Sequence, residues 1–138
     1  MSDMGFTPNF IASGDINPFR FVEINTSTAF TGQQANAASD NVLGVTDGSV
    51  KRFDRTVHAA AGDPITLQPS NTVQVESGGA ISTIGALLTS DSSGRAVAGA
   101  STNVCYYMAL ETAGGAGESS VRSASALALS KAITYKED

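Results

Sequence analysis

Short apolar or alternating stretches, separated by turn-forming residues, make up most of the chain. Residues 72–76 alternate, so that Val73 and Val75 point to one side of an expected strand and Gln74 and Glu76 to the other. Residues 77–79, Ser-Gly-Gly, end this stretch. The pattern predicts a strand with one buried face.

A hairpin is predicted immediately afterwards. Residues 84–88 are an apolar run of strand length, and residues 91–94, Asp-Ser-Ser-Gly, form a strong turn signal. Residues 95–97 then lead out as the second arm of the hairpin. Gly94 suits the turn because glycine adopts a positive φ without steric cost.

Similar patterns predict four further strands, at residues 19–24, 42–45, 65–68 and 104–110. The last is apolar on both faces, as in a central strand. Two segments are ambiguous. Residues 32–40 are polar and alanine-rich and predict either one helical turn or a surface loop, and residues 121–133 fit a helical stripe and a strand equally well. The predicted fold is therefore mainly β, with short strands.

Composition adds a hint about assembly. The 138 residues predict one domain, and only 15% of them are charged, whereas about 25% is usual. Glycine, alanine, serine and threonine take the place of charged residues. Such a surface suits close contact between neighbouring chains, and it equally suits a loop-rich β protein with small residues in its turns.

Charge and cysteine content exclude several classes of function. The net charge is −5, and Lys51, Arg52 and Arg55 form the one cluster of cations, so we expect no nucleic-acid partner. No apolar run is long enough to span a membrane, so no membrane partner is expected. The single Cys105 excludes an intramolecular disulfide. The first ten residues lack the basic and apolar parts of a signal peptide, which predicts a protein that is made and kept inside a cell or leaves only when the cell bursts.

Residues able to carry catalysis are few. His58 is the only histidine, and no cysteine or carboxylate stands at metal-ligand spacing from it, so we expect a structural histidine and no metal site. A Ser-His-Asp triad would have to use His58, and nothing near it in the sequence suggests a nucleophile. Cys105 is expected to be a small core residue. The glycines of residues 113–118 match neither phosphate-loop spacing, and no GxSxG, HExxH or CxxC motif occurs, so the sequence gives little support for an enzyme.

The N-terminal residues 1–13 are predicted to be an extended arm. Pro8 and its neighbours argue against a helix, while Phe6, Phe10 and Ile11 argue against a purely solvated tail. We expect this arm to dock on another chain; packing on its own domain is the alternative. Its candidate binding residues are Phe6, Pro8, Phe10 and Ile11.

Several phrases of the sequence, taken in order, resemble the capsid cement, or head decoration, proteins of tailed bacteriophages. The phrases are ASGDINPFRFV at residues 12–22, LGV at 43–45, AGDPI at 61–65, GALLTSD at 85–91, GRAV at 94–97, ALE at 109–111 and GE at 117–118. Each phrase alone is weak, and their common order over residues 12–118 makes the resemblance more specific.

The resemblance implies a small β-clip or β-tulip-like domain, similar to the lambda-type head decoration protein. It implies a homotrimer that binds the major capsid protein on the outer surface of the virion, after synthesis in the host cytoplasm, with no enzymatic activity and no cofactor. In the lambda type, an N-terminal arm orders on the capsid and extends a sheet of the shell protein. By position, that arm corresponds to residues 2–13 here.

The expected organisation is thus an arm at residues 1–13, a β-rich decoration domain at 14–118 and a C-terminal extension at 119–138. The extension departs from the resemblance, since similar proteins often end soon after the Gly-Glu phrase and one last strand. It is expected to be either an extra strand or a contact to a neighbouring trimer.

Two other functions remain open from the sequence. One is a β-rich tail, fibre or surface-binding module of a virion. The other is an enzyme, with the trimeric dUTP hydrolases as the comparison because their fold is also clip-like; their nucleotide-binding motifs are not found in this sequence.

Overall fold

The computed structural model of the chain describes residues 10–37, 42–70, 72–99, 105, 107–117 and 121–125. Within these ranges the regular structure consists of ten short strands, and none of the described residues is helical. The predicted mainly β fold is confirmed. No described segment forms a helix that could cross a membrane.

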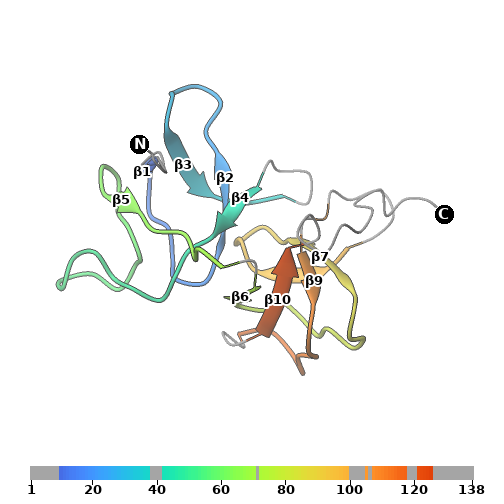
Figure 1. The fold of residues 1–138 in the computed structure, drawn as a ribbon. Coiled ribbons are helices and arrows are strands. Elements are labelled where there is room, and N and C mark those ends of the chain that lie inside the picture. The colour runs from blue at the N-terminus through green and yellow to red at the C-terminus, as the bar shows by residue number, and fades with distance from the viewer. Residues whose placement is uncertain are drawn as a thin grey trace.

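The strands form two small sheets that lie side by side (Figure 1). In the first sheet β1 and β3 are parallel and all other pairs are antiparallel. Beyond its last strand, Leu67 bridges back to Thr46, which follows β4, so the sheet curls until its outer strands meet. Its strand order is β4 (Val42–Val45), β2 (Phe21–Ile24), β3 (Thr31–Gln34), β1 (Phe10–Ala12) and β5 (Pro64–Ile65).

The second sheet is antiparallel throughout. It also curls on itself, because Ser77, just after β6, bridges to Ala96 in β8. Mutual pairing of outer strands leaves little free edge on either sheet, which limits uncontrolled pairing with other chains. The strand order is β6 (Thr72–Val75), β10 (Val121–Ser125), β9 (Tyr107–Ala109), β7 (Leu87–Ser90) and β8 (Ala96–Ala98).

Each sheet encloses a hydrophobic core, and β2 contributes to both. Successive side chains of a strand point to opposite faces. Val22 therefore packs in the first core, with Ala12 and Ile16, while Phe21 packs in the second core. There the ring of Phe21 lies 5.6 Å from that of Tyr107, centroid to centroid.

The turn between β7 and β8 joins the two sheets. The N–H of Phe21 donates to the carbonyl of Gly94 at 2.8 Å, and the carbonyl of Phe21 accepts from the N–H of Ala35 at 2.9 Å. Gly94 has a φ of +76°, and a Cβ added there would lie 2.8 Å from Gln34 Cγ. Only glycine satisfies both conditions, the positive φ and the close approach.

Charged side chains reinforce the same junction. Arg20, which precedes β2, donates from Nη1 to the carbonyl of Ser93 at 2.8 Å, and its Nη2 lies 3.3 Å from Glu76 Oε2. Arg95 approaches the same carboxylate oxygen at 3.7 Å. The two arginines and Glu76 are less than a third exposed. The Arg20–Glu76 pair links the first sheet to the second at the point where the backbones also meet, and Arg95 approaches Glu76 from within the second sheet.

Several predicted elements are confirmed. Residues 72–75 form β6 with Val73 and Val75 buried and Gln74 exposed, as the alternation requires. Residues 42–45 form β4 as predicted. The predicted hairpin pairs β7 with β8 around the turn at residues 91–94, where Asp91 Oδ1 accepts from the N–H groups of Ser93 and Arg95.

Two predictions of local structure are wrong. The strand expected at residues 84–88 begins only at Leu87, because Gly85 has a φ of +92° and Ile84 lies exposed in a turn. Residues 32–40 were expected to be a helical turn or a loop, but residues 31–34 form β3 between β2 and β1. Sheet partners, not the propensity of a Gly-Gln-Gln sequence, impose that strand.

Two further segments fall at the expected domain limits. Residues 121–125, at the start of the expected C-terminal extension, form β10 between β6 and β9. Residues 10–12, near the end of the expected arm, form β1 inside the chain's own first sheet. The remaining parts of the expected arm and extension, residues 1–9, 119–120 and 126–138, lie outside the described residues.

Substitution of Gly94 by alanine tests the junction. We expect Gly94→Ala to lower the free energy of unfolding by about 1–3 kcal/mol, since it adds both φ strain and contacts with the first sheet. Gly85→Ala is the matched control, because Gly85 also has a positive φ but open space around it. Equal losses in urea denaturation for the two variants would contradict the close-approach argument.

Candidate interaction surfaces

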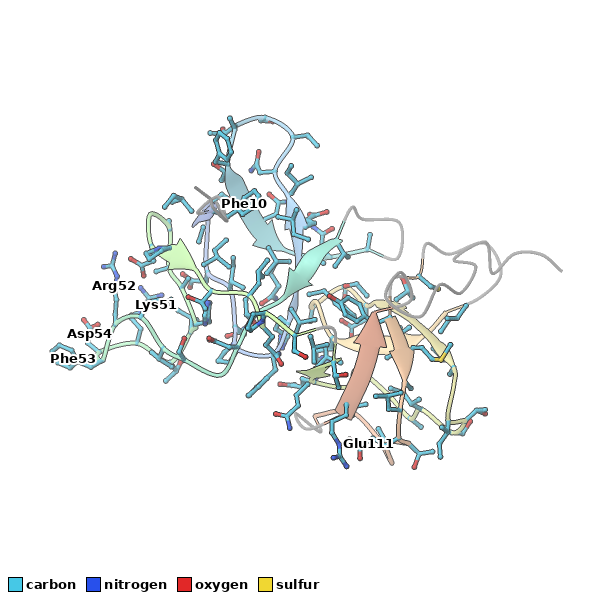
Figure 2. The ribbon with its side chains drawn as sticks, viewed as in Figure 1. Phe10, Lys51, Arg52, Phe53, Asp54 and Glu111 are labelled. Carbon is cyan, nitrogen blue, oxygen red and sulfur yellow. The ribbon has the colours of Figure 1, made fainter. Side chains whose placement is uncertain are left out.

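An apolar rim lies at the end of the first sheet where the chain enters β1. Phe10 lies two positions from Ala12 in β1, and Ile24 lies two positions from Val22 in β2. Phe10 and Ile24 therefore point to the same face as these two residues of the first core. Phe30 completes the rim, and its ring centroid lies 6.3 Å from that of Phe10. We call Phe10, Ile24 and Phe30 the aromatic rim (Figure 2 labels Phe10).

Phe30 is held in an unfavourable conformation. Its φ is +55°, in the left-handed region that bulky residues rarely adopt, and its side chain is 61% exposed. The flanking backbone fixes it there, because the carbonyl of Phe30 accepts from the N–H of Ile11 and the carbonyl of Thr31 accepts from the N–H of Asn25. Such strain costs about 1–3 kcal/mol and persists only where the surrounding contacts hold the backbone in place.

The predicted binding residues of the arm are divided by the structure. Phe10 and Ile11 lie in β1, where Phe10 is half-buried and Ile11 is 39% exposed. Phe6 and Pro8 lie outside the described residues. The structure therefore brings Phe10 to the aromatic rim, directly after the segment that carries Phe6 and Pro8, and docking of that segment on another chain stays a prediction.

A second surface, which the sequence reasoning did not single out, is the loop of residues 49–57. Figure 2 shows Lys51, Arg52, Phe53 and Asp54 at the tip of this loop, which extends away from both sheets. Phe53 is fully exposed. The sequence signal was a phenylalanine placed between charged residues in the most charged segment of the chain.

His58 holds the base of this loop. Its side chain is completely buried; Nδ1 lies 2.8 Å from the carbonyl of Ser49, and Nε2 accepts from the N–H of Thr66 at 3.1 Å. These contacts assign the proton of the neutral ring to Nδ1. Burial lowers the pKa of His58 below its ordinary value. The prediction of a structural histidine is confirmed.

The arrangement of Ser49, His58 and Asp47 differs from that of a catalytic triad, although the three side chains lie close together. In a triad the serine and the carboxylate bind opposite nitrogens of the imidazole. Here Asp47 Oδ1 lies 3.4 Å from Nδ1 and Ser49 Oγ lies 3.5 Å from that same nitrogen. The Ser49 hydroxyl donates to Asp47 at 2.6 Å, and Nε2 is taken by the backbone. The trio fixes a turn.

Two arginines tie the loop to neighbouring segments. Arg52 binds Asp63 through two nitrogens, with Nε 2.9 Å from Oδ2 and Nη2 2.7 Å from Oδ1. The hydrogen bonds from Arg52 and the backbone of Ala60 lower the pKa of Asp63. Arg55 Nη2 lies 3.0 Å from Asp15 Oδ2. A two-pronged guanidinium–carboxylate pair fixes orientation as well as distance.

The remaining candidate residues are part of the scaffold. Cys105 is buried, as predicted, and burial raises the pKa of its thiol. Among the residues that the structure describes, no three or more histidine, cysteine, aspartate or glutamate side chains gather where they could hold a metal ion.

No family model matches the chain, and no curated protein does. A solved structure, the head fibre gp8.5 N base of bacteriophage phi29, is similar over 85% of this chain and 89% of its own, with a TM-score of 0.58 and 17% sequence identity. The two chains share a fold. At this identity the likeness concerns the fold alone.

The pH dependence of stability tests the state of His58. Because its pKa is lower in the folded chain, the unfolded chain takes up the proton first as pH falls below about 6.5. Stability should be constant above that pH and decline towards pH 5.5. In His58→Gln that decline should disappear, while overall stability drops by about 1–3 kcal/mol for each buried partner left unpaired. Urea denaturation at pH 6.5 and pH 5.5 measures the free energy of unfolding at each pH. If the free energy of unfolding of the variant falls between these pH values as much as that of the unaltered chain, the account of His58 is contradicted.

Proposed function

We propose that this chain is a structural protein of a tailed-phage head, and specifically a decoration protein that binds the outer surface of the assembled head as a homotrimer. The fold shared with the phi29 head fibre base, over most of both chains, is the observation that carries the proposal. The ordered phrases that resemble head decoration proteins support it independently. Catalysis and cofactors are not part of the proposed role.

The proposed contact with the shell begins at the aromatic rim. Residues 1–9 lead directly into β1, and β1 is fixed on both sides by β3 and β5. The arm is therefore attached to a strand that pairs with a neighbour on each side. Phe6 of the arm and Phe10 of the rim would supply apolar anchors, and fully burying one phenylalanine contributes roughly 1.5–3 kcal/mol.

Stabilisation of the shell follows from preferential binding. A ligand that binds the assembled shell, and not its free subunits, shifts the equilibrium towards the shell. An extended arm can satisfy the unpaired backbone groups of a sheet edge in the shell protein. Three arms in one trimer would then act together, since the second and third bind at a high effective concentration.

The base of a head fibre is a second candidate function. The similar phi29 structure is that of the N base of a head fibre, so the same fold occurs in a head fibre base. In that case the chain would anchor a projection, and stabilisation of the shell would be secondary. Both candidates share attachment to the head and differ in what stands above the domain.

Deletion of residues 1–9 tests the arm. This cut ends before β1, so all ten described strands remain. We therefore expect the circular dichroism spectrum and the oligomeric state to match those of the full chain. Binding to heads that lack the protein, measured by co-sedimentation, should be lost. Undiminished binding by this truncated chain would contradict the proposed role of the arm.

A further inference from the structure

The two hydrogen bonds of the His58 ring require its neutral form. Nδ1 donates to the carbonyl of Ser49 at 2.8 Å, while Nε2 accepts from the N–H of Thr66 at 3.1 Å. A second proton on the ring would have to sit on Nε2, where it would face the N–H of Thr66. Two donors cannot bond to each other, so protonation of His58 breaks its contact with Thr66.

The surroundings of the ring do not favour a positive charge. The side chain of His58 is 0% exposed, and burial, the largest cause, lowers its pKa. Among the described residues, the charges of Asp47 and Lys51 act on the ring, and they oppose each other. Asp47 Oδ1 lies 3.4 Å from Nδ1 but already accepts from the N–H and the hydroxyl of Ser49, at 3.0 and 2.6 Å. A protonated ring is therefore stable only where water reaches it.

Both ends of the loop of residues 49–57 meet at His58. Ser49 accepts from the ring, and the N–H of Lys51 donates to the carbonyl of His58 at 3.0 Å. Residues 48–50 and 52–56 are exposed, and none of the loop residues belongs to either hydrophobic core. Displacing the loop thus exposes little apolar surface, and such segments open at a lower free energy than the whole chain unfolds.

Contacts on either side of the loop confine the opening to it. Before the loop, the N–H of Asp47 donates to the carbonyl of Thr66 at 3.1 Å. Directly after His58, Ala59 and Ile16 exchange two backbone hydrogen bonds, of 2.8 and 3.1 Å. The chain is fixed to the first sheet at both places, so the segment between them can move while the sheet stays intact.

Two ion pairs also hold the loop, but water weakens them. Arg52 binds Asp63 and Arg55 binds Asp15, and these arginine side chains are 51% and 40% exposed. Exposed ion pairs contribute little to stability. The buried contacts of His58 are therefore the stronger hold on the loop.

His58 is also the one side chain of this sequence whose ordinary pKa lies between pH 5 and 8. Burial alone would raise the pKa of Asp47, but the hydrogen bonds from Ser49 outweigh it and the pKa is lowered. Hydrogen bonds from Arg52 lower the pKa of Asp63. These carboxylates stay charged at pH 5, so a change in the loop within this range reports the state of His58.

We propose that His58 is a pH switch for the loop of residues 49–57: the neutral ring keeps the loop closed, and the protonated ring opens it while both sheets stay folded. This inference does not depend on the proposed function, because it concerns the isolated chain. Proton uptake on unfolding lowers the stability of the whole chain in acid, and the switch adds the place where the folded chain opens first.

Hydrogen–deuterium exchange of the full chain at pH 7.5 and pH 5.0 tests the switch, with labelling times scaled to the intrinsic exchange rate at each pH. Peptides from residues 47–67 should exchange faster in acid, by up to about tenfold for each pH unit below about 6.5, because opening takes up one proton. Peptides from residues 72–98, which form β6, β7 and β8, should keep their protection. Equal protection of residues 47–67 at both pH values, or loss of protection in both segments together, would overturn the switch.

Two substitutions should move the midpoint of opening in opposite directions. Asp47→Asn keeps an oxygen for the Ser49 hydrogen bonds but removes the charge that favours a protonated ring, so opening should need a lower pH. Lys51→Gln removes the charge that opposes protonation, so opening should begin at a higher pH. NMR titration of the His58 ring measures its pKa in the same variants.

His58→Gln is the control, because its loop should show the same protection at pH 7.5 and pH 5.0. If that variant does not fold, the two charge variants still decide the matter. A midpoint that stays unchanged in both, or that moves in the same direction in both, would show that His58 does not control the loop.

Discussion

The fold depends on one backbone contact, between Phe21 in β2 and Gly94 in the turn after β7. Phe21 donates its N–H to Gly94 while its ring fills the second core, and its neighbour Val22 fills the first. The strand β2 therefore contributes side chains to both cores, and the turn at Gly94 is hydrogen-bonded to it where the two sheets meet. Arg20, Glu76 and Arg95 surround this contact, so charge, packing and backbone geometry all oppose separation of the sheets.

The exposed phenylalanines among the described residues lie away from this junction. The aromatic rim and the loop of residues 49–57 both belong to the first sheet, away from the junction, and each is fixed by its own contacts. The second sheet, by comparison, exposes only scattered apolar side chains such as Ile84 and Leu110 among its described residues. The exposed phenylalanines among the described residues, Phe30 and Phe53, thus lie on the side of the first sheet.

Much of the scaffold could be predicted from the sequence, and the surfaces could not. Strict alternation located β6, and the Asp-Ser-Ser-Gly turn located the β7–β8 hairpin, because both depend on local geometry. The strand β3 escaped detection since Gly32 and two glutamines have no strand preference of their own; a Cβ at Gly32 would come within 2.9 Å of Ile65, so close packing explains the glycine. The sequence drew attention to the phenylalanines of the arm, but exposure of Phe53 follows from His58, Asp63 and Asp15, which no local pattern connects to it.

Electron microscopy of phage heads, with and without this protein, tests the central claim most directly. The account predicts density for three copies of the domain on the outer surface, at three-fold or quasi-three-fold positions. That density should be absent from heads made without the protein, and the end bearing β1 should face the shell. Density for this protein on the tail, or identical heads in both preparations, would contradict the account.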